Sequence, residues 1–301
     1  MIANVEAYLA LRRATGFALS NTEYLLHSFA AFAADRQEQH IRTTMVIDWA
    51  SESMTVAQRH ARYQTVCRFA HYVRLEDPQH ESPPPNYFGY RKIRRVPHIY
   101  SHTEIDHLIL ATTQLSPRDS LRPNTFATLI SLLAVTGLRI SEALRLLVSD
   151  VTPNGLLIRK TKFQKTRLVP LHETSSAGLQ RYLTHPRRAR TDRNHVFVSN
   201  SGQPLTYPQV YWVFQKLLKL ADLPPSRGHR LRLNELRHTF SVRALESAPA
   251  GRQRTGQHML ALANYLGHVN IDSTYWYLET TPELLADIAA AGEVFLHGRQ
   301  T

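Results

Sequence analysis

Apolar residues in the first 82 positions recur at helical spacing and are separated by short polar turns. The clearest runs repeat every three or four residues, which places their side chains on one buried helix face. These runs are Leu25, Leu26, Phe29 and Phe32, then Val66, Phe69, Ala70 and Val73. Thr55 precedes the second run and is predicted to cap its helix. We therefore predict a helical N-terminal domain over residues 1–82.

The pattern changes over residues 83–100. Pro83, Pro84 and Pro85 cannot continue a helix and favour an extended segment. Four cations follow within five residues, at Arg91, Lys92, Arg94 and Arg95. We interpret residues 83–100 as a basic linker between two domains.

Residues 101–301 form the second predicted domain. Ser101 and Glu104 have the spacing of a capping box, which marks the start of its first helix. Helical patterns also predict helices over 126–135, 141–147 and 207–220, and a tail helix over 283–295. Gly137 is predicted to end the first of these helices. In the helix over 207–220, the predicted core residues are Tyr211, Phe214, Leu217 and Leu218. Residues 156–158 and 167–171 predict a small antiparallel hairpin. The expected fold is mainly α with a small antiparallel β-sheet.

Composition describes a globular protein with a polyanionic partner. The 301 residues are 43% hydrophobic and 20% charged, and their net charge is +12. Residues 1–97 hold 12 basic and 9 acidic side chains, which leaves 24 and 15 for the remainder. Lysine and arginine neutralise phosphates, so nucleic acid is the expected partner.

Cysteine and hydropathy narrow the class further. Cys67 is the only cysteine, which excludes an intrachain disulfide and a cysteine-based zinc site, and its apolar setting favours a core position. The most apolar stretch, residues 126–138, is shorter than the ~20 residues needed to span a bilayer. With no secretory signal pattern at the N-terminus, we expect a cytoplasmic protein without membrane contact.

An ordered set of short motifs runs through the second domain. The motifs are T-G-L-R-I-S-E at 136–142, K-T-K-F-Q-K-T-R-L-V-P-L at 160–171, L-R-H-T-F at 236–240, L-G-H at 266–268, and a tyrosine at 277. Two arginines, a lysine, a histidine and a tyrosine are the groups needed to attack a DNA phosphodiester with a phenol. The set resembles the tyrosine recombinase (phage integrase) family, and in particular its branch from transposons and integrated elements.

The resemblance implies an α-helical DNA-binding domain, an α+β catalytic domain and a role for each motif residue. Tyr277, nine residues after His268, matches the family's nucleophile, which forms a 3′-phosphotyrosine. Lys162 matches the lysine that protonates the leaving oxygen, and Lys165 is the alternative or a DNA contact. His268 matches a hydrogen-bond donor to the phosphate. Because the bond energy is stored in the phosphotyrosine, no cofactor or metal is expected.

The chemistry of the side chains agrees with these roles. Guanidinium groups meet phosphate oxygens bidentately, so Arg139 and Arg237 are the candidate clamp. Glu142, three residues after Arg139 on a helix, is expected to orient that arginine. His238 is expected to pack or hydrogen-bond beneath the site.

Asn234 departs from the family pattern, which has histidine three residues before the second arginine. Asparagine can donate or accept a hydrogen bond but cannot take a proton. This difference leaves open whether the protein acts autonomously or with a partner protomer.

The leading hypothesis is a recombinase that binds inverted DNA sites as a homodimer and pairs two sites in a homotetramer, with or without sister recombinases. Its tail docks on a neighbouring protomer or on its own core. Arg59 and Arg62, neighbours on one helix, are candidate phosphate contacts or solvated surface residues. The alternatives are a telomere resolvase, a type IB topoisomerase and a catalytically silent accessory DNA-binding protein.

Overall fold

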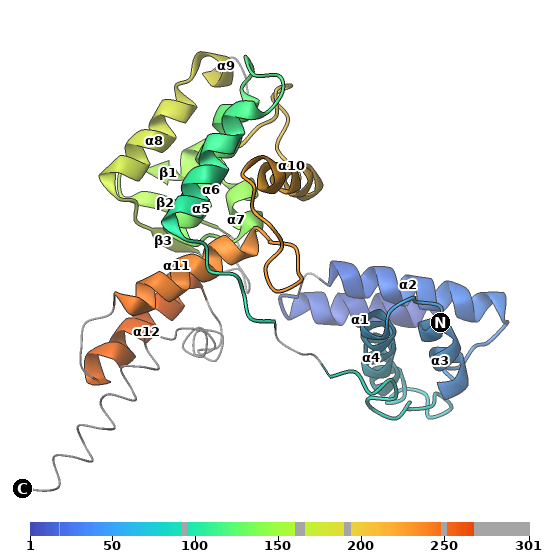
Figure 1. Cartoon of the computed structure of the whole chain (residues 1–301). Coiled ribbons are helices and arrows are strands. Elements are labelled where there is room, and N and C mark those ends of the chain that lie inside the picture. Colours follow the sequence, from blue (N-terminus) through green and yellow to red (C-terminus); the bar gives the residue numbers. More distant parts are fainter. Residues whose placement is uncertain (18, 92–94, 160–165, 190–193, 248–251, 268–301) are drawn as a thin grey trace, which may run out of the picture. The chain divides into compact units, whose positions relative to one another are not determined.

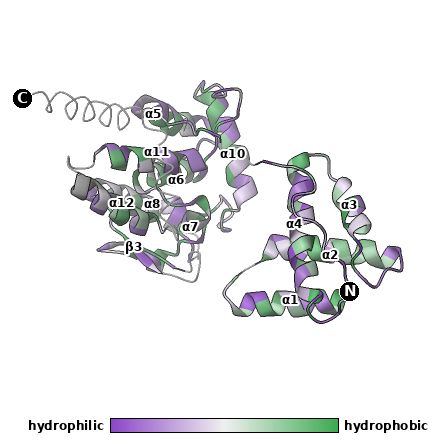
Figure 2. Cartoon of the chain, turned by 90° about the horizontal axis from the view of Figure 1, so that it is seen from below, coloured by the Kyte–Doolittle hydropathy of each residue, from purple (hydrophilic) through white to green (hydrophobic). Residues whose placement is uncertain are grey.

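The computed structural model describes residues 1–17, 19–91, 95–159, 166–189, 194–247 and 252–267, with the backbone alone for 252–255. The chain forms two compact units, unit 1 (Met1–Arg95) and unit 2 (Val96–Thr301). Each unit has its own hydrophobic core. Helices such as α1, α4 and α10 carry hydrophobic and hydrophilic residues together, as expected for helices with one buried face (Figure 2).

Unit 1 is helical, as the periodicity predicts. Its helices are α1 (Ile2–Ala14), α2 (Ser20–Asp35), α3 (Thr43–Ser51) and α4 (Val56–Val73). Phe29, Trp49 and Phe69 are fully buried at its centre. Thr55 caps α4, because its side chain accepts a hydrogen bond from the Gln58 N–H at 3.2 Å.

Part of the segment predicted as linker packs on unit 1. The Tyr63 hydroxyl donates to the Pro84 carbonyl at 2.8 Å, and the rings of Tyr87 and Phe88 lie 5.7 and 5.5 Å from that of Tyr63. Residues 83–91 and 95–100 contain no helix or strand. These contacts with the buried Tyr63 therefore extend unit 1 beyond its last helix, although Tyr87 itself is exposed.

Unit 2 begins with a tether to one of its later helices. The Tyr100 N–H donates to the Thr239 hydroxyl at 2.9 Å, and the Tyr100 carbonyl accepts from Arg243 at 2.6 Å. The capping box predicted after it is confirmed. Ser101 accepts from the Glu104 N–H at 3.1 Å, and Glu104 accepts from the Ser101 N–H at 2.7 Å.

One buried helix organises unit 2. Its helices are α5 (His102–Ala111), α6 (Arg122–Thr136), α7 (Ile140–Arg145), α8 (Glu173–Leu183), α9 (Pro186–Ala189), α10 (Tyr207–Leu220), α11 (Asn234–Glu246) and α12 (Arg252–Leu266), with 3-10 turns η1 (Thr112–Gln114) and η2 (Val148–Asp150). Helix α6 packs against α5, α8 and α11 (Figure 1). Its residues Leu129, Ile130 and Leu133 are buried in the core.

A small antiparallel sheet completes unit 2. Its strands are β1 (Val151–Thr152), β2 (Gly155–Ile158) and β3 (Arg167–Val169), in the order β1-β2-β3. Leu156 pairs with Val169, and Ile158 pairs with Arg167. The fold is mainly helical with a small antiparallel sheet, as predicted. The sequence did not predict β1, and β3 ends two residues earlier than expected.

Helix α10 has the predicted bounds, but one of its expected core residues is misplaced. Phe214, Leu217 and Leu218 are buried, whereas Tyr211 is only partly buried. Its ring lies 5.8 Å from that of the exposed Trp212. Tyr211 therefore lies at the edge of the buried face. Among the described residues, no helix combines the length and apolarity required to cross a membrane.

Gly137 ends α6 in a left-handed conformation, with φ 59° and ψ 21°, and its N–H donates to Leu133. A Cβ at this position would lie 2.5 Å from Cδ1 of Phe240. The Phe240 ring cannot easily move away, since it stacks on Tyr265 with centroids 5.5 Å apart. The turn therefore requires glycine for both its backbone and its packing.

We predict that Gly137→Ala lowers the free energy of unfolding by roughly 2–4 kcal/mol, from left-handed strain and overpacking together. Chemical denaturation measures this loss. Gly228→Ala is the matched control, because Gly228 has φ +75° with no atom within 4 Å of its Cβ position. Equal losses in the two variants would contradict the packing part of the argument.

Candidate active site

The T-G-L-R-I-S-E motif folds into a turn between two helices. After Gly137, Arg139 stands at the N-terminus of α7, where its backbone N–H donates to Glu142 Oε2 at 3.0 Å. Glu142 thus satisfies one of the unpaired N–H groups at the start of α7. The same carboxylate accepts from Arg139 Nη1 at 2.8 Å. The predicted contact between Glu142 and Arg139 is present.

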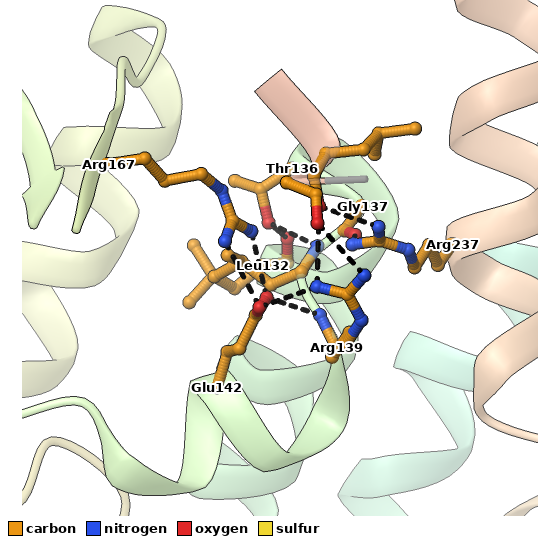
Figure 3. A network of polar contacts seen from close by, with 10 residues as sticks. Leu132, Thr136, Gly137, Arg139, Glu142, Arg167 and Arg237 are labelled. Atoms are coloured by element: carbon orange, nitrogen blue, oxygen red, sulfur yellow. Dashed lines mark hydrogen bonds and ion pairs between the residues drawn. The ribbon is translucent and has the colours of Figure 1, made fainter. Parts of the chain in front are cut away.

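A second arginine binds the same carboxylate from β3. Arg167 Nη1 donates to Glu142 Oε1 at 3.1 Å, and Arg167 Nη2 donates to Oε2 at 2.9 Å. Arg139 and Arg167 reach Glu142 from two sides (Figure 3). The Glu142 side chain is 7% exposed, that of Arg167 12%, and that of Arg139 32%. Each carboxylate oxygen therefore accepts two hydrogen bonds, which fills its lone pairs.

The surroundings of Glu142 hold it in its charged form. Burial favours the neutral carboxyl group, but the hydrogen bonds and charge of Arg167, followed by those of Arg139, outweigh burial and lower its pKa to about 2. A carboxylate with this pKa and four donors is a poor proton acceptor near neutral pH. It suits the orientation of arginines.

Arg237 lies on the first turn of α11 and is 4% exposed. Its Nη1 donates to the Gly137 carbonyl at 2.7 Å, and its Nη2 donates to the Leu266 carbonyl at 2.8 Å. Arg237 therefore joins the end of α6 to the end of α12. Figure 3 shows its guanidinium beside that of Arg139.

The end of α12 supplies carbonyl acceptors to the same cluster. Arg139 Nη1 and Nη2 donate to the carbonyls of Leu266 and Gly267, both at 3.4 Å. A helix C-terminus carries partial negative charge, which favours these contacts. Gly267 has φ +66°, and a Cβ there would lie 2.9 Å from Arg167 Nη1. The residue after Gly267 is His268, which lies outside the described residues, as does Tyr277.

The remaining motif residues fall in two places. Lys162 and Lys165 belong to the β2–β3 connection, outside the described residues. Asn234 is exposed at the start of α11, and its side-chain amide donates to His238 Nε2 at 3.0 Å. Burial, together with the charges of Arg232 and Arg237, lowers the pKa of His238 to about 4. His238 is therefore neutral at physiological pH.

The predicted DNA-contact arginines in unit 1 hold a turn together. Arg59 donates to the Ser53 carbonyl at 2.7 Å, and Arg62 donates to the Ser53 hydroxyl at 2.9 Å. The Arg62 guanidinium also lies 4.0 Å from the ring centroid of Trp49. Both side chains thus have structural partners at the α3–α4 turn. In the linker, Arg91 and Arg95 are exposed, and Lys92 and Arg94 lie outside the described residues.

Arg167 is the site residue that sequence reasoning missed. It lies in the motif at 160–171, but no role was predicted for it from the sequence. The sequence held a signal for this role, namely an arginine at the start of a predicted strand with apolar residues. If the side chain of such an arginine is buried, its charge needs a partner. Three guanidinium groups and one carboxylate leave this cluster with net positive charge, which suits it to hold an anionic group.

Comparisons with known proteins identify the family. Residues 98–283 match the model of the phage integrase family. The chain is 34% identical over 294 residues to "Putative integrase/recombinase y4rB" of Sinorhizobium fredii, which covers 94% of each protein. It is 36% identical over 300 residues to "Putative integrase/recombinase y4rE" of the same species, covering 98% of this chain and 96% of that protein.

Solved structures share the fold. The Tn1549 transposon integrase in complex with transposon right end DNA gives a TM-score of 0.65 at 16% identity, covering 97% of this chain and 98% of that one. A lambda integrase dimer bound to a COC′ core site gives a TM-score of 0.65 at 15% identity, covering 94% and 96%. The chain belongs to the phage integrase family. It is a tyrosine-type recombinase, a class of enzyme that breaks and rejoins DNA.

We predict that the Glu142 carboxylate stabilises unit 2 in a pH-dependent way. A pKa lowered from 4.5 to about 2 corresponds to about 3 kcal/mol, fully present above pH of about 5 and lost as the pH falls towards 2. The free energy of unfolding should be measured between pH 7 and pH 2. As the pH is lowered over this range, it should fall more steeply for the wild type than for Glu142→Gln. Glu173→Gln, which removes an exposed glutamate of the same unit, is the control. A gap between wild type and Glu142→Gln that does not change with pH would rule out this role.

Proposed function

We propose that this protein is a site-specific DNA recombinase that integrates, excises or transposes a mobile element. The observation that carries the proposal is the cluster in which Arg139 and Arg167 bind Glu142 and Arg237 lies beside Arg139, at the end of the helix that leads into His268. The names of the relatives support an integrase role, and the fold is shared with a transposon integrase.

In the proposed mechanism, Arg139 and Arg237 bind the non-bridging oxygens of the scissile phosphate and stabilise the charge that develops there. The Tyr277 phenol loses its proton to water, its oxygen attacks phosphorus, a 3′-phosphotyrosine bond forms, and the bond to the 5′-oxygen breaks. Lys162 gives a proton to that leaving oxygen, and Lys165 is the alternative donor. His268 donates a hydrogen bond to the phosphate. The departing 5′-hydroxyl or one from another strand later reverses the step.

The positive charge in this mechanism comes from side chains, and the proposal includes no cofactor or metal. Glu142 positions Arg139, and His238 holds the amide of Asn234. Arg237 is suited to a fixed phosphate contact, because the carbonyls of Gly137 and Leu266 anchor its guanidinium. Preorganised donors of this kind cost no rearrangement during the reaction.

The proposed substrate is double-stranded DNA with inverted recombination sites, in the cytoplasm. Lambda integrase has been solved as a dimer on a core site and as a tetramer on a Holliday junction. We propose the same states for this chain, with sister recombinases as additional partners. The domain limits in this proposal are 1–82 for DNA binding, 83–100 for the linker and 101–301 for catalysis.

Phosphate contacts are assigned mainly to the linker. Arg91 and Arg95 are exposed, and together with Lys92 and Arg94 they form a run of charge that suits a DNA backbone. Arg59 and Arg62 are weaker candidates, because both guanidinium groups already bind the α3–α4 turn. They would contact DNA through donors that the turn does not use.

The nucleophile is tested by covalent trapping on a nicked suicide substrate. Tyr277→Phe should abolish the protein–DNA adduct while DNA binding persists, because the substitution removes only the phenolic oxygen. Tyr275→Phe is the matched control and should leave the adduct intact. Denaturing gel electrophoresis measures both. If Tyr275→Phe abolishes the adduct and Tyr277→Phe does not, the nucleophile is reassigned to Tyr275. If the wild-type protein binds the DNA but forms no adduct, it is a silent accessory protein.

The Asn234 side chain predicts an unusual pH profile. It cannot take the Tyr277 proton, and His238, with a pKa of about 4 and Nε2 engaged by Asn234, is a weak base. The single-turnover cleavage rate should therefore rise from pH 6 towards the phenol pKa of about 10. Asn234→His should flatten the profile and raise cleavage near pH 7 by up to ~10²-fold. Parallel profiles for the two proteins would mean that position 234 carries no proton in the reaction.

A further inference from the structure

Arg167 occupies a place in the cluster that the mechanism above leaves without a role. It begins β3, is nearly buried, and binds both oxygens of Glu142. Arg139 makes a single side-chain bond to the same carboxylate, and its side chain is the more exposed of the two. Arg139 and Arg167 thus share the Glu142 carboxylate unequally, and the more buried Arg167 makes the bidentate contact.

This division determines the charge that Arg139 can offer. With Arg167 present, two guanidinium groups face one carboxylate, and the trio has a net charge of +1. Without Arg167, Glu142 and Arg139 would form a neutral pair. Inside a protein, opposite charges at contact distance interact strongly, so Arg139 would be drawn towards Glu142 and its attraction for another anion would weaken.

A second contact places Arg167 under the other acceptors of Arg139. The left-handed Gly267 lies against the Arg167 guanidinium, so closely that a Cβ would reach 2.9 Å from Nη1. The Gly267 carbonyl is one of the groups to which Arg139 donates. Arg167 therefore touches both sides of the frame that orients Arg139: the Glu142 carboxylate and the Gly267 backbone.

We propose that Arg167 is a positioning residue that takes up the charge of Glu142 and so keeps Arg139 cationic towards the scissile phosphate. This inference rests on the proposed function, in which Arg139 binds that phosphate. Arg167 itself touches no substrate in this account. Its effect passes through Glu142 and must therefore depend on the charge of that residue.

The test is a double-mutant cycle on single-turnover cleavage, with Arg167→Gln, Glu142→Gln and the double variant. Arg167→Gln should slow cleavage roughly tenfold or more, the order expected for coupling within one ion-pair network. The double variant should cleave faster than Arg167→Gln alone, because it removes the carboxylate that would neutralise Arg139. A double variant as slow as the single variant, or slower, would overturn the proposal.

A second substrate separates a charge effect from general damage. A methylphosphonate at the scissile position replaces one charged oxygen with a neutral methyl group, so it needs less positive charge from Arg139. Arg167→Gln should slow cleavage of this substrate much less than cleavage of the ordinary phosphodiester. Equal slowing on both substrates would show that Arg167 acts only as a structural support, and would overturn the proposal.

Folding is controlled within the same set of variants. Arg167→Gln leaves Glu142 buried with one arginine and can destabilise unit 2. Arg167→Lys keeps a cation beside Glu142, and the double variant removes the charge of Glu142. Neither leaves the Glu142 carboxylate with Arg139 as its only cation, so these two variants carry the test if Arg167→Gln unfolds. Both should keep a ratio of phosphodiester to methylphosphonate rates within a few fold of the wild type. A ratio reduced tenfold in either folded variant would contradict the charge argument.

A binding arm separates this proposal from the proposed function. In the Tyr277→Phe background, where no cleavage occurs, the wild-type cluster should bind the phosphodiester more tightly than the methylphosphonate. Arg167→Gln should reduce the preference for the phosphodiester, and adding Glu142→Gln to that variant should restore the preference. If the wild type forms no adduct, the proposed function fails while this arm still decides the role of Arg167. An unchanged preference in Arg167→Gln would refute that role even in an active recombinase.

Discussion

The candidate site depends on a single buried carboxylate. Glu142 accepts four hydrogen bonds, three from arginine side chains and one from the start of α7. It thereby joins the turn after α6 to the first residue of β3. Arg237 adds the end of α12 to the same frame, because it donates both to the Gly137 carbonyl after α6 and to the Leu266 carbonyl of α12. Elements distant in sequence are thus held by ionic and backbone contacts at one point, and a loss there would disturb several motif segments together.

Local signals allowed much of the fold to be predicted. The Ser101–Glu104 capping box and the end of α6 at Gly137 depend on residues close in sequence, so their patterns were readable. Strand β1 escaped because two residues are too few to show a period. Tyr211 was misplaced because periodicity alone does not fix where a buried helix face ends.

The site was predicted less completely than the fold. Arg139 and Glu142 are in contact as predicted, because they lie one helical turn apart. Arg237 lies beside Arg139, and both donate to the Leu266 carbonyl. The partnership between Arg167 and Glu142 joins residues 25 positions apart and depends on tertiary packing. The same reason explains Arg59 and Arg62, which sequence placed on a helix surface. Only the folded unit shows that the preceding turn engages them.

The tether at Tyr100 has a mechanical consequence. Both backbone groups of Tyr100 bond to α11, through Thr239 and Arg243, so the incoming segment is fixed to the helix that carries Arg237. Thr239 is only two residues from Arg237. A pull on the segment from unit 1 would therefore be carried by α5, through the contact between His98 and Glu104, and by α11, through the bonds of Tyr100. The second of these paths ends within one helical turn of a candidate phosphate-binding arginine.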